Sequence, residues 1–292
     1  MIDYLIGVDG GGTGTRVRLA RADGSELAQG ASGPSGLRHG IANAWNAVNA
    51  AVAQAFAAIG IDGIPLPSCA IGLGLAGVHN KDWAANFRAA NPGYAALVLE
   101  TDGYSTLMGA HQGRPGAIVA IGTGSVGDAL LPDGTRREVG GWGFPAGDEA
   151  SGAWMGLRAL NHIEQVIDGR VQGGDFAREV IEACGGTRDA VQVWLGKATQ
   201  TDYASLARHV VAHGPSDPVA LAILEHAGRE VASIARALDP SGALPLSLCG
   251  GLGEPLRTYL PAATLAHCSP PHGDSAAGAL RMIALHLKDT QQ

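Results

Sequence analysis

Two short glycine- and threonine-rich segments have the residue types of a phosphate-binding turn. Gly12-Thr13-Gly14-Thr15 recurs 110 positions later as Gly122-Thr123-Gly124-Ser125. Glycine lets a ligand approach the backbone closely, and successive exposed N–H groups form a site for anions. We therefore expect both segments to contact the phosphates of a nucleotide. The residues expected to do so are Gly11, Gly12, Thr13, Gly14, Thr15, Gly122, Thr123, Gly124 and Ser125.

A second pair of motifs repeats at the same spacing. Asp23-Gly24-Ser25 recurs as Asp133-Gly134-Thr135, again 110 positions later. Two motif pairs with one spacing indicate two copies of one supersecondary unit, each a strand, a Gly/Thr turn, a strand, an Asp-Gly turn and a strand. Two such turns facing each other would hold a polyphosphate between two lobes. The pattern predicts a nucleotide-dependent phosphotransferase.

Two aspartates follow strands that the sequence predicts. Asp9 ends a strand over residues 2–9 and precedes a run of three glycines, where a carboxylate can hold Mg²⁺ directly or through water. Asp102 follows a strand over residues 96–101, and the carboxyl ends of parallel strands face the ligand crevice. Asp102 can accept the proton of a hydroxyl that attacks a γ-phosphate, or it can cap the next helix. Its position alone favours neither role.

A second glycine-rich cluster spans residues 140–152. Trp142 lies between Gly141 and Gly143, and an aromatic face with accessible backbone suits a sugar. Asp148 and Glu149 precede an expected helix, whose N-terminus favours anionic or hydroxyl-rich ligands. Helix capping is the alternative for Glu149 and its neighbours.

Two further motifs have weaker implications. Residues 72–77 match G-x-G-x-x-G but lack a following ribose-binding acid, so we interpret them as close packing at a strand end. His209 and His213 are spaced as on one helix face, but no glutamate accompanies them as in a zinc helix, and we expect them to face solvent.

Apolar spacing places helices and strands around these motifs in both halves of the chain. Strands are expected over 2–9, 15–21, 26–31, 69–73, 96–101, 117–121 and 245–251; helices over 40–59, 82–90, 104–111, 148–167, 174–184, 188–196, 201–213, 217–238 and 274–287. Strands that alternate with helices predict an α/β architecture of two lobes. The helix-breaking run near residues 113–116 marks the expected boundary.

Composition excludes several classes of protein. The chain has 292 residues, enough for two domains, and a net charge of −7 with dispersed Lys and Arg, which argues against nucleic acid as the main partner. No apolar run reaches the ~18 residues of a membrane span, and no secretion signal is visible. The four cysteines form no Cys-x-x-Cys motif, which favours buried, reduced thiols and a cytoplasmic location.

Several segments together resemble the BadF/BadG/BcrA/BcrD ATPase family. These segments are residues 6–13, Thr101-Asp102, 121–125, 140–143 and 147–149, in that order. The family includes N-acetylglucosamine and glucosamine kinases and belongs to the actin/hexokinase/Hsp70 superfamily. The resemblance implies a two-lobed, actin-like (ribonuclease H-like) fold with a central nucleotide cleft. It implies an N-terminal lobe over 1–112 and a C-terminal lobe over 113–292 that carries a helical insertion, with the last helix able to pack back on the first lobe.

The resemblance also implies roles for single residues in an ATP- and Mg²⁺-dependent amino-sugar kinase. Thr13 and Thr123 resemble contacts to the ATP phosphates, and Asp102 resembles the base that faces the sugar 6-hydroxyl. The positions that resemble sugar contacts are Gly141, Trp142, Gly143 and Asp148. Gly250 and Gly251 resemble the turn on the adenosine side, and Gly214 and Ser275 align with residues that line the nucleotide. A homodimer is also implied.

Two positions depart from the family pattern. The sugar kinases often have Asn where this chain has Gly36, so Ser35 or a water is expected to replace that contact; Ala150 replaces a usual glycine. Both departures concern the choice of amino sugar. The alternative from the same family is an ATP-driven activator with an iron–sulfur cluster at a dimer interface, for which Cys184 is the only cysteine in a glycine-rich turn. A sugar sensor without catalysis is a third reading.

Overall fold

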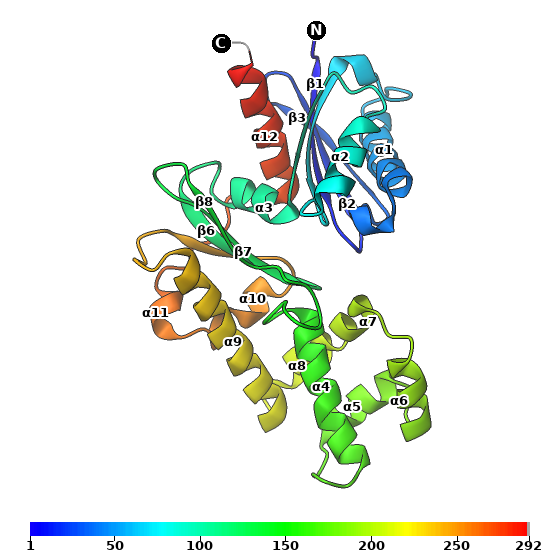
Figure 1. The fold of residues 1–292 in the computed structure, drawn as a ribbon, viewed down its shortest axis with the longest axis vertical. Helices are drawn as coiled ribbons and strands as arrows, with labels where there is room; N and C mark the ends of the chain where they lie inside the picture. The colour runs from blue at the N-terminus through cyan, green and yellow to red at the C-terminus, as the bar shows by residue number, and fades with distance from the viewer. Residues whose placement is uncertain (291–292) are drawn as a thin grey trace. The chain divides into compact units, whose positions relative to one another are not determined.

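The computed structural model describes residues 1–290, and the chain forms two compact units. Unit 1 comprises Met1–Pro115 and the C-terminal segment from Pro271, whereas unit 2 comprises Gly116–Pro270. Each unit contains one mixed sheet and its own helices (Figure 1). No helix within residues 1–290 is long and apolar enough to cross a membrane.

The sheet of unit 1 has the strand order β3-β2-β1-β4-β5. Its strands are β1 (Tyr4–Gly10), β2 (Thr15–Arg21), β3 (Glu26–Ser32), β4 (Cys69–Leu75) and β5 (Ala96–Glu100). The first three strands pair antiparallel, and β4 and β5 run parallel to β1. This is the ribonuclease H-like arrangement that the resemblance implies.

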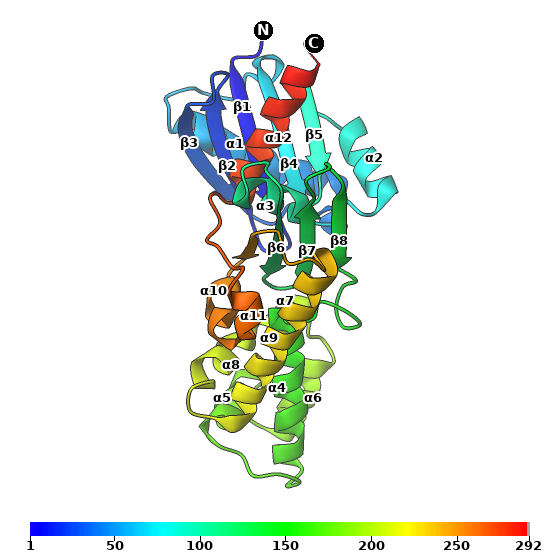
Figure 2. The same ribbon diagram turned by 90° about the vertical axis from the view of Figure 1, so that its left-hand side faces the viewer.

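Helices cover both faces of this sheet (Figure 2). They are α1 (Ile41–Ala57), α2 (Lys81–Ala89), α3 (Asp102–Ala110) and α12 (Ser275–Asp289), with short 3₁₀ turns at Leu37–His39 (η1) and Leu66–Ser68 (η2). Alternation along β1 separates the faces, because Ile6 and Val8 join the α1 core while Leu5 packs with Ile283 of α12.

Glycines let α12 and α3 lie directly on the sheet. A Cβ at Gly7 would overlap the Ala276 carbonyl oxygen, and one at Gly72 would overlap that of Ala279. A Cβ at Gly74 would overlap Ser105 Oγ of α3. The G-x-G-x-x-G segment therefore serves close packing, as its sequence indicated.

Unit 2 repeats four of the five strands of unit 1 in the order β8-β7-β6-β9, and its described sheet has no counterpart of β5. Its strands are β6 (Gly116–Ile121), β7 (Ser125–Leu130), β8 (Arg136–Gly140) and β9 (Leu246–Cys249). Strands β6, β7 and β8 pair antiparallel, and β9 runs parallel to β6. The prediction of two copies of one unit is confirmed at the level of sheet topology.

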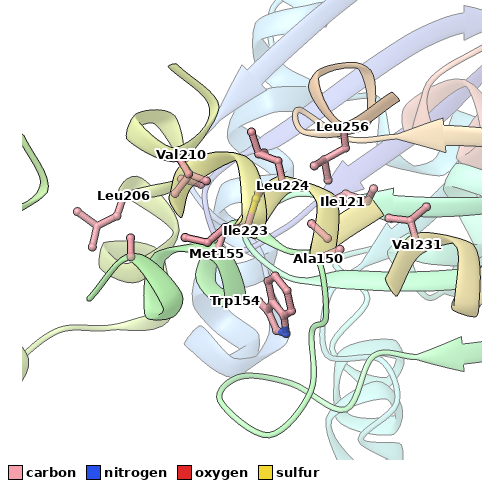
Figure 3. Packing of buried hydrophobic residues seen from close by; sticks show 14 of the residues in the cluster. Ile121, Ala150, Trp154, Met155, Leu206, Val210, Ile223, Leu224, Val231 and Leu256 are labelled. Atoms are coloured by element: carbon pink, nitrogen blue, oxygen red, sulfur yellow. The ribbon is translucent and has the colours of Figure 1, made fainter. Parts of the chain in front are cut away.

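Helices supply most of the core of unit 2. They are α4 (Gly152–Ile167), α5 (Asp175–Ala183), α6 (Arg188–Leu195), α7 (Gln200–Ser205), α8 (Ala207–His213), α9 (Pro218–Leu238), α10 (Gly253–Leu256), a 3₁₀ turn η3 (Arg257–Tyr259) and α11 (Ala262–Leu265). Figure 3 shows Ile121 of β6 in one cluster with Trp154 and Met155 of α4 and Leu224 of α9. This packing fixes the end of β6, from which the second Gly/Thr turn extends.

Two expectations about the region 200–213 are wrong. The single helix expected there is two helices, α7 and α8, with Leu206 between them. His209 and His213 do not face solvent, because their side chains are only 15% and 16% exposed and both contact Glu179 Oε2, at 3.2 and 3.0 Å. That glutamate lies on α5, so helical spacing alone could not reveal it.

Candidate active site

The first Gly/Thr turn connects β1 to β2. Gly10 pairs with Thr15, and the Gly11 amide donates to the Gly14 carbonyl at 3.0 Å. Thr13 is exposed at this turn, whereas Thr15 is buried. Thr15 Oγ1 donates to the Gly33 carbonyl at 2.7 Å, so this hydroxyl holds the turn against the segment that follows β3.

The segment 33–36 lies directly against the first turn. The Ser35 and Gly36 amides donate to the Gly11 carbonyl at 3.2 and 3.0 Å. Ser35 is fully buried, and its Oγ lies 2.7 Å from Thr15 Oγ1. The sequence predicts that Ser35 and Gly36 contact the sugar. In this structure both residues support the first turn.

The second Gly/Thr turn connects β6 to β7 in unit 2. Like the first turn, it has one accessible and one buried hydroxyl. Ile121 pairs with Ser125, and the Gly122 amide donates to the Gly124 carbonyl at 2.9 Å. Thr123 is partly exposed, while Ser125 is buried and its Oγ donates to the Glu149 carbonyl at 2.6 Å. In both turns one hydroxyl is available to a ligand and the other is used internally.

Asp148 lies against the second turn. Its carboxylate accepts hydrogen bonds from the Ser125 and Gly143 amides and from Gln200 Nε2, the last at 2.6 Å. The side chain is buried, and this burial raises the pKa of Asp148 despite those hydrogen bonds. Its carboxylate therefore connects the second turn to the glycine-rich segment and to α7.

The segment before α4 is not helical, although the sequence predicted a helix from residue 148. Asp148 and Ala150 have left-handed φ values of 59° and 66°, and α4 begins at Gly152. Ser151 Oγ accepts from the Trp154 amide at 3.1 Å and caps the helix. The Gly152 amide donates to the Gly122 carbonyl at 2.8 Å, so the helix start contacts the second turn.

Trp142 is exposed to solvent, and the glycines around it have left-handed backbone conformations. Gly140, Gly141 and Gly143 have φ values of 78°, 71° and 85°, which few other residues adopt. Trp142 itself is 85% exposed. The exposed indole and the accessible backbone beside it are the features that the sequence associated with sugar binding.

The two candidate nucleotide segments farther along unit 2 differ in their surroundings. Gly250 follows β9 with φ 80°, where a Cβ would overlap the Ile121 carbonyl oxygen, so Gly250 and Gly251 lie beside the second turn. Gly214 is buried at the end of α8, against Leu224 and Tyr259. This contact gives Gly214 a packing role in the structure.

Asp102 is the first residue of α3 rather than its cap. Thr101 takes the capping position, and its Oγ1 accepts from the Tyr104 amide at 3.1 Å. Asp102 is partly exposed at the carboxyl end of β5. The capping role that competed for Asp102 in the sequence therefore belongs to its neighbour.

Asp9, near the end of β1, lies close enough to Asp102 for the charge of Asp102 to affect its pKa. Burial raises the pKa of Asp9 to about 6; Arg16, whose Nε is 3.8 Å away, opposes this shift, and the charges of Asp102 and Asp274 add to it. Within residues 1–290 no cluster of three His, Cys, Asp or Glu side chains could hold a metal ion. One carboxylate in a negative field nevertheless fits Mg²⁺, which keeps several waters and takes its remaining ligands from phosphate oxygens.

Ser275 lies beside α3, and a network that the sequence did not reveal places it there. Ser275 Oγ is 2.6 Å from Thr106 Oγ1, which in turn donates to the Asp102 carbonyl at 2.7 Å. Asp274 caps α12 and is held by Arg18, with Nη2 to Oδ2 at 2.7 Å. An Asp before a helix is a recognisable capping signal, but the pairing with Arg18 spans most of the chain.

The cysteines are free within unit 1 and unit 2, and Cys69, Cys184 and Cys249 are buried as expected. Cys184 is 2% exposed in the core of unit 2, and burial raises the pKa of its thiol to about 11. This environment disfavours the thiolate that an iron–sulfur ligand requires.

Comparison with known proteins identifies several relatives of this chain. The glucosamine kinase GspK of Vibrio cholerae serotype O1 is 32% identical over 281 residues, covering 96% of this chain and 95% of that protein. An N-acetylmuramic acid/N-acetylglucosamine kinase of Clostridium acetobutylicum is 28% identical over 236 residues, covering 78% and 76%. A crystal structure of a candidate N-acetylglucosamine kinase from Chromobacterium violaceum has a TM-score of 0.95 at 51% identity, over 97% of this chain and 99% of that one.

The family assignment rests on the chain as a whole. The family model that matches extends over residues 6–253 and so includes both Gly/Thr turns, Asp102 and the cluster at 140–152. The similarity to GspK extends over nearly the full length of both proteins. The resemblance seen in the motifs is thus confirmed, and the chain belongs to the BadF/BadG/BcrA/BcrD ATPase family.

Proposed function

We propose that this protein is an ATP-dependent sugar kinase that phosphorylates an amino sugar on its 6-hydroxyl, with Asp102 as the general base. The observation that carries the proposal is the position of Asp102. Its carboxylate follows β5 in the same unit as the first Gly/Thr turn, and Thr101 rather than Asp102 caps α3. The Asp102 carboxylate is partly exposed and does not occupy the N-cap position, although its Oδ1 accepts from the Gly103 amide at 3.1 Å, and such a carboxylate is suited to accept a proton from a bound hydroxyl.

In this proposal the transfer proceeds in a single displacement. Asp102 takes the proton of the sugar 6-hydroxyl, the hydroxyl oxygen bonds to the γ-phosphorus, and the bond from that phosphorus to the β,γ-bridging oxygen breaks. The products are ADP and a sugar 6-phosphate. Positioning and charge stabilisation supply most of the catalysis of such a reaction.

Thr13 and Thr123 would contact the ATP phosphates, because their hydroxyls are the accessible ones of the two turns. Thr15 and Ser125 would act by holding the turns, since both are buried and bonded internally. Asp9 would hold Mg²⁺ through one oxygen or through water. The ion would neutralise charge on the phosphates.

The remaining site residues fall into two groups. Gly250 and Gly251, beside the second turn, would lie near the adenosine part of ATP. Gly141, Trp142 and Gly143 would contact the sugar, with Asp148 beside them. Glucosamine and N-acetylglucosamine are the proposed substrates, since the relatives bear those names. We also propose a homodimer in the cytoplasm, on the basis of the family resemblance and the free thiols.

The test compares Asp102→Asn with the wild type in a sugar-dependent assay of ADP release. The panel contains glucosamine, N-acetylglucosamine, N-acetylmuramic acid and glucose, each with Mg-ATP. We expect sugar-stimulated ADP release by the wild type and a loss of about 10²–10⁴-fold in Asp102→Asn, with ATP affinity nearly unchanged. Normal turnover by the variant would remove Asp102 from the mechanism. ADP release that no sugar stimulates would reject the kinase assignment.

A further inference from the structure

Arg38 lies beside the first Gly/Thr turn and has no part in the proposed transfer. It follows the segment 33–36, whose amides bond to the Gly11 carbonyl, and it lies within η1. A Cβ at Gly12 would lie 3.0 Å from Arg38 Nη2 and 3.7 Å from its Cζ. The guanidinium therefore stands against the tip of the turn.

The backbone that carries Arg38 is anchored, and no ion pair within the described chain draws its guanidinium away from the turn. The Leu37 amide donates to the Ala76 carbonyl at 2.9 Å and anchors η1 to the end of β4. No ion pair joins Arg38 to any carboxylate within residues 1–290, and its Nε lies 3.4 Å from the His39 imidazole. By contrast, Arg16 pairs with Asp9, and Arg18 pairs with Glu26 and Asp274.

A cation at this position would offset the repulsion between the carboxylates of unit 1 and a bound polyphosphate. Asp9 and Asp102 place negative charge in the same unit as the first turn, and that charge repels an incoming polyphosphate. A guanidinium is always charged, and its planar fork matches two oxygens of one phosphate group. Arg38 is exposed and has no carboxylate partner in the described part of the chain, so two N–H groups of its guanidinium can donate to two oxygens of one phosphate.

We propose that Arg38 binds the terminal phosphate of ATP and stabilises the charge that develops on it during transfer. This inference rests on the proposed function, because the γ-phosphorus is the atom that the hydroxyl held by Asp102 attacks. The first turn and Asp102 belong to the same unit, and the charge of Asp102 acts on Asp9 at the start of this turn, so we assign the reacting phosphate to the first turn. Arg38 thereby becomes a catalytic residue that supplies the fixed positive charge typical of phosphoryl transfer.

The test uses Arg38→Gln and Arg38→Lys, with Arg21→Gln as the matched control. Arg21 is an exposed arginine at the opposite end of β2 from the turn. We expect Arg38→Gln to lower kcat by about 10²-fold, and Arg38→Lys to lower it less because the charge is kept without the fork. The KM for the sugar should stay within about twofold, and Arg21→Gln should resemble the wild type.

Equilibrium binding separates this inference from the proposed function. We expect Arg38→Gln to weaken binding of a non-hydrolysable ATP analogue about tenfold and to leave ADP binding unchanged. If Arg38→Gln weakens the binding of ADP and of the analogue equally, or leaves kcat unchanged while the wild type is an active kinase, the role of Arg38 is overturned and the kinase proposal stands. A rise in KM confined to N-acetylmuramic acid would assign Arg38 to the sugar's carboxylate instead. Absence of any nucleotide binding by the wild type would reject the kinase proposal itself.

Discussion

Single residues in the two Gly/Thr turns have separable roles, because each turn has one accessible and one buried hydroxyl. We expect Thr123→Ala to lower kcat/KM for ATP about 10- to 100-fold, since a hydrogen bond to a charged group contributes about 1.5–3 kcal/mol. Its unfolding free energy should change little. Ser125→Ala should instead destabilise the fold by about 1–3 kcal/mol, because the partly buried Glu149 carbonyl loses its donor.

Steady-state kinetics and urea unfolding of both variants test this division. The reverse pattern, with Ser125→Ala impaired only in ATP use and Thr123→Ala only in stability, would contradict it. Thr13→Ala and Thr15→Ala provide the same comparison in the first turn.

Asp128 is a fully buried carboxylate of β7 that should make stability depend on pH. Burial raises its pKa to about 6, although Arg136 Nη2 lies 2.6 Å from Oδ2 and opposes the shift. A raised pKa in the folded state means that the folded protein binds the proton more tightly than the unfolded chain. The stabilisation is therefore complete below the unfolded pKa of about 3.9 and is lost as pH rises through about 6.

The neutral variant Asp128→Asn lacks this titration. Its unfolding free energy should rise relative to that of the wild type between about pH 4 and 6.5, that is, between the unfolded and folded pKa values of Asp128, by on the order of 3 kcal/mol at most. Urea unfolding at several pH values measures the difference. Asp133→Asn is the control, because Asp133 is exposed and its lowered pKa lies below this window. A pH-independent difference for Asp128→Asn would show that the buried carboxylate does not titrate there.

At the scale of elements, the contact of α12 with the sheet depends on glycines that admit no side chain. A Cβ at Gly72 would overlap the Ala279 carbonyl oxygen of α12. We expect Gly72→Ala to cost about 1–3 kcal/mol, because the helix must move away from β4. Gly33→Ala is the control, since no atom lies within 4 Å of that Cβ position. Equal unfolding free energies for the two variants would contradict this account.

The elements themselves could be predicted well because their patterns are local. The spacing of apolar residues in α1 and the 110-residue repeat of the two turns required no tertiary information. The start of α4 could not be predicted, since Asp148 and Ala150 adopt left-handed φ values in contact with the second turn. The contacts of His209 and His213 with Glu179 depend on the neighbouring helix α5.

The places of the candidate site residues in the fold were predictable to the same degree. The turns, Asp9 and Asp102 follow from strand ends and glycine runs. The sequence could not show that Ser35 is buried behind the first turn or that Thr101 displaces Asp102 from the cap. The burial of Ser35 depends on its contact with Thr15, 20 residues earlier in the chain, and the cap depends on which of two adjacent polar side chains accepts from the Tyr104 amide.

At the scale of the whole molecule, unit 2 is inserted into unit 1. All buried residues of its main core lie between Ala117 and Leu260. We expect a fragment of residues 116–270 to fold alone, whereas a fragment of residues 1–115 should not. The latter lacks α12, which covers Leu5 and Ala70. Circular dichroism and thermal unfolding of the two fragments test this difference.

A third fragment, with residues 271–292 joined to Pro115 by a short glycine-serine linker, should recover a cooperative transition. The join is sterically reasonable because the His272 amide donates to the Ala110 carbonyl at 3.0 Å. Cooperative unfolding of residues 1–115 alone would contradict the requirement for α12.

The insertion also imposes an order on folding during synthesis. Translation at about 5–20 residues per second takes on the order of ten seconds to pass through residues 116–270. Throughout that time β1 and β4 have been made, but the helix that covers Leu5 and Ala70 has not. The nascent chain therefore carries an uncovered apolar sheet face beside a completed second unit. During this interval the exposed apolar face of the sheet is a binding surface for chaperones at the ribosome.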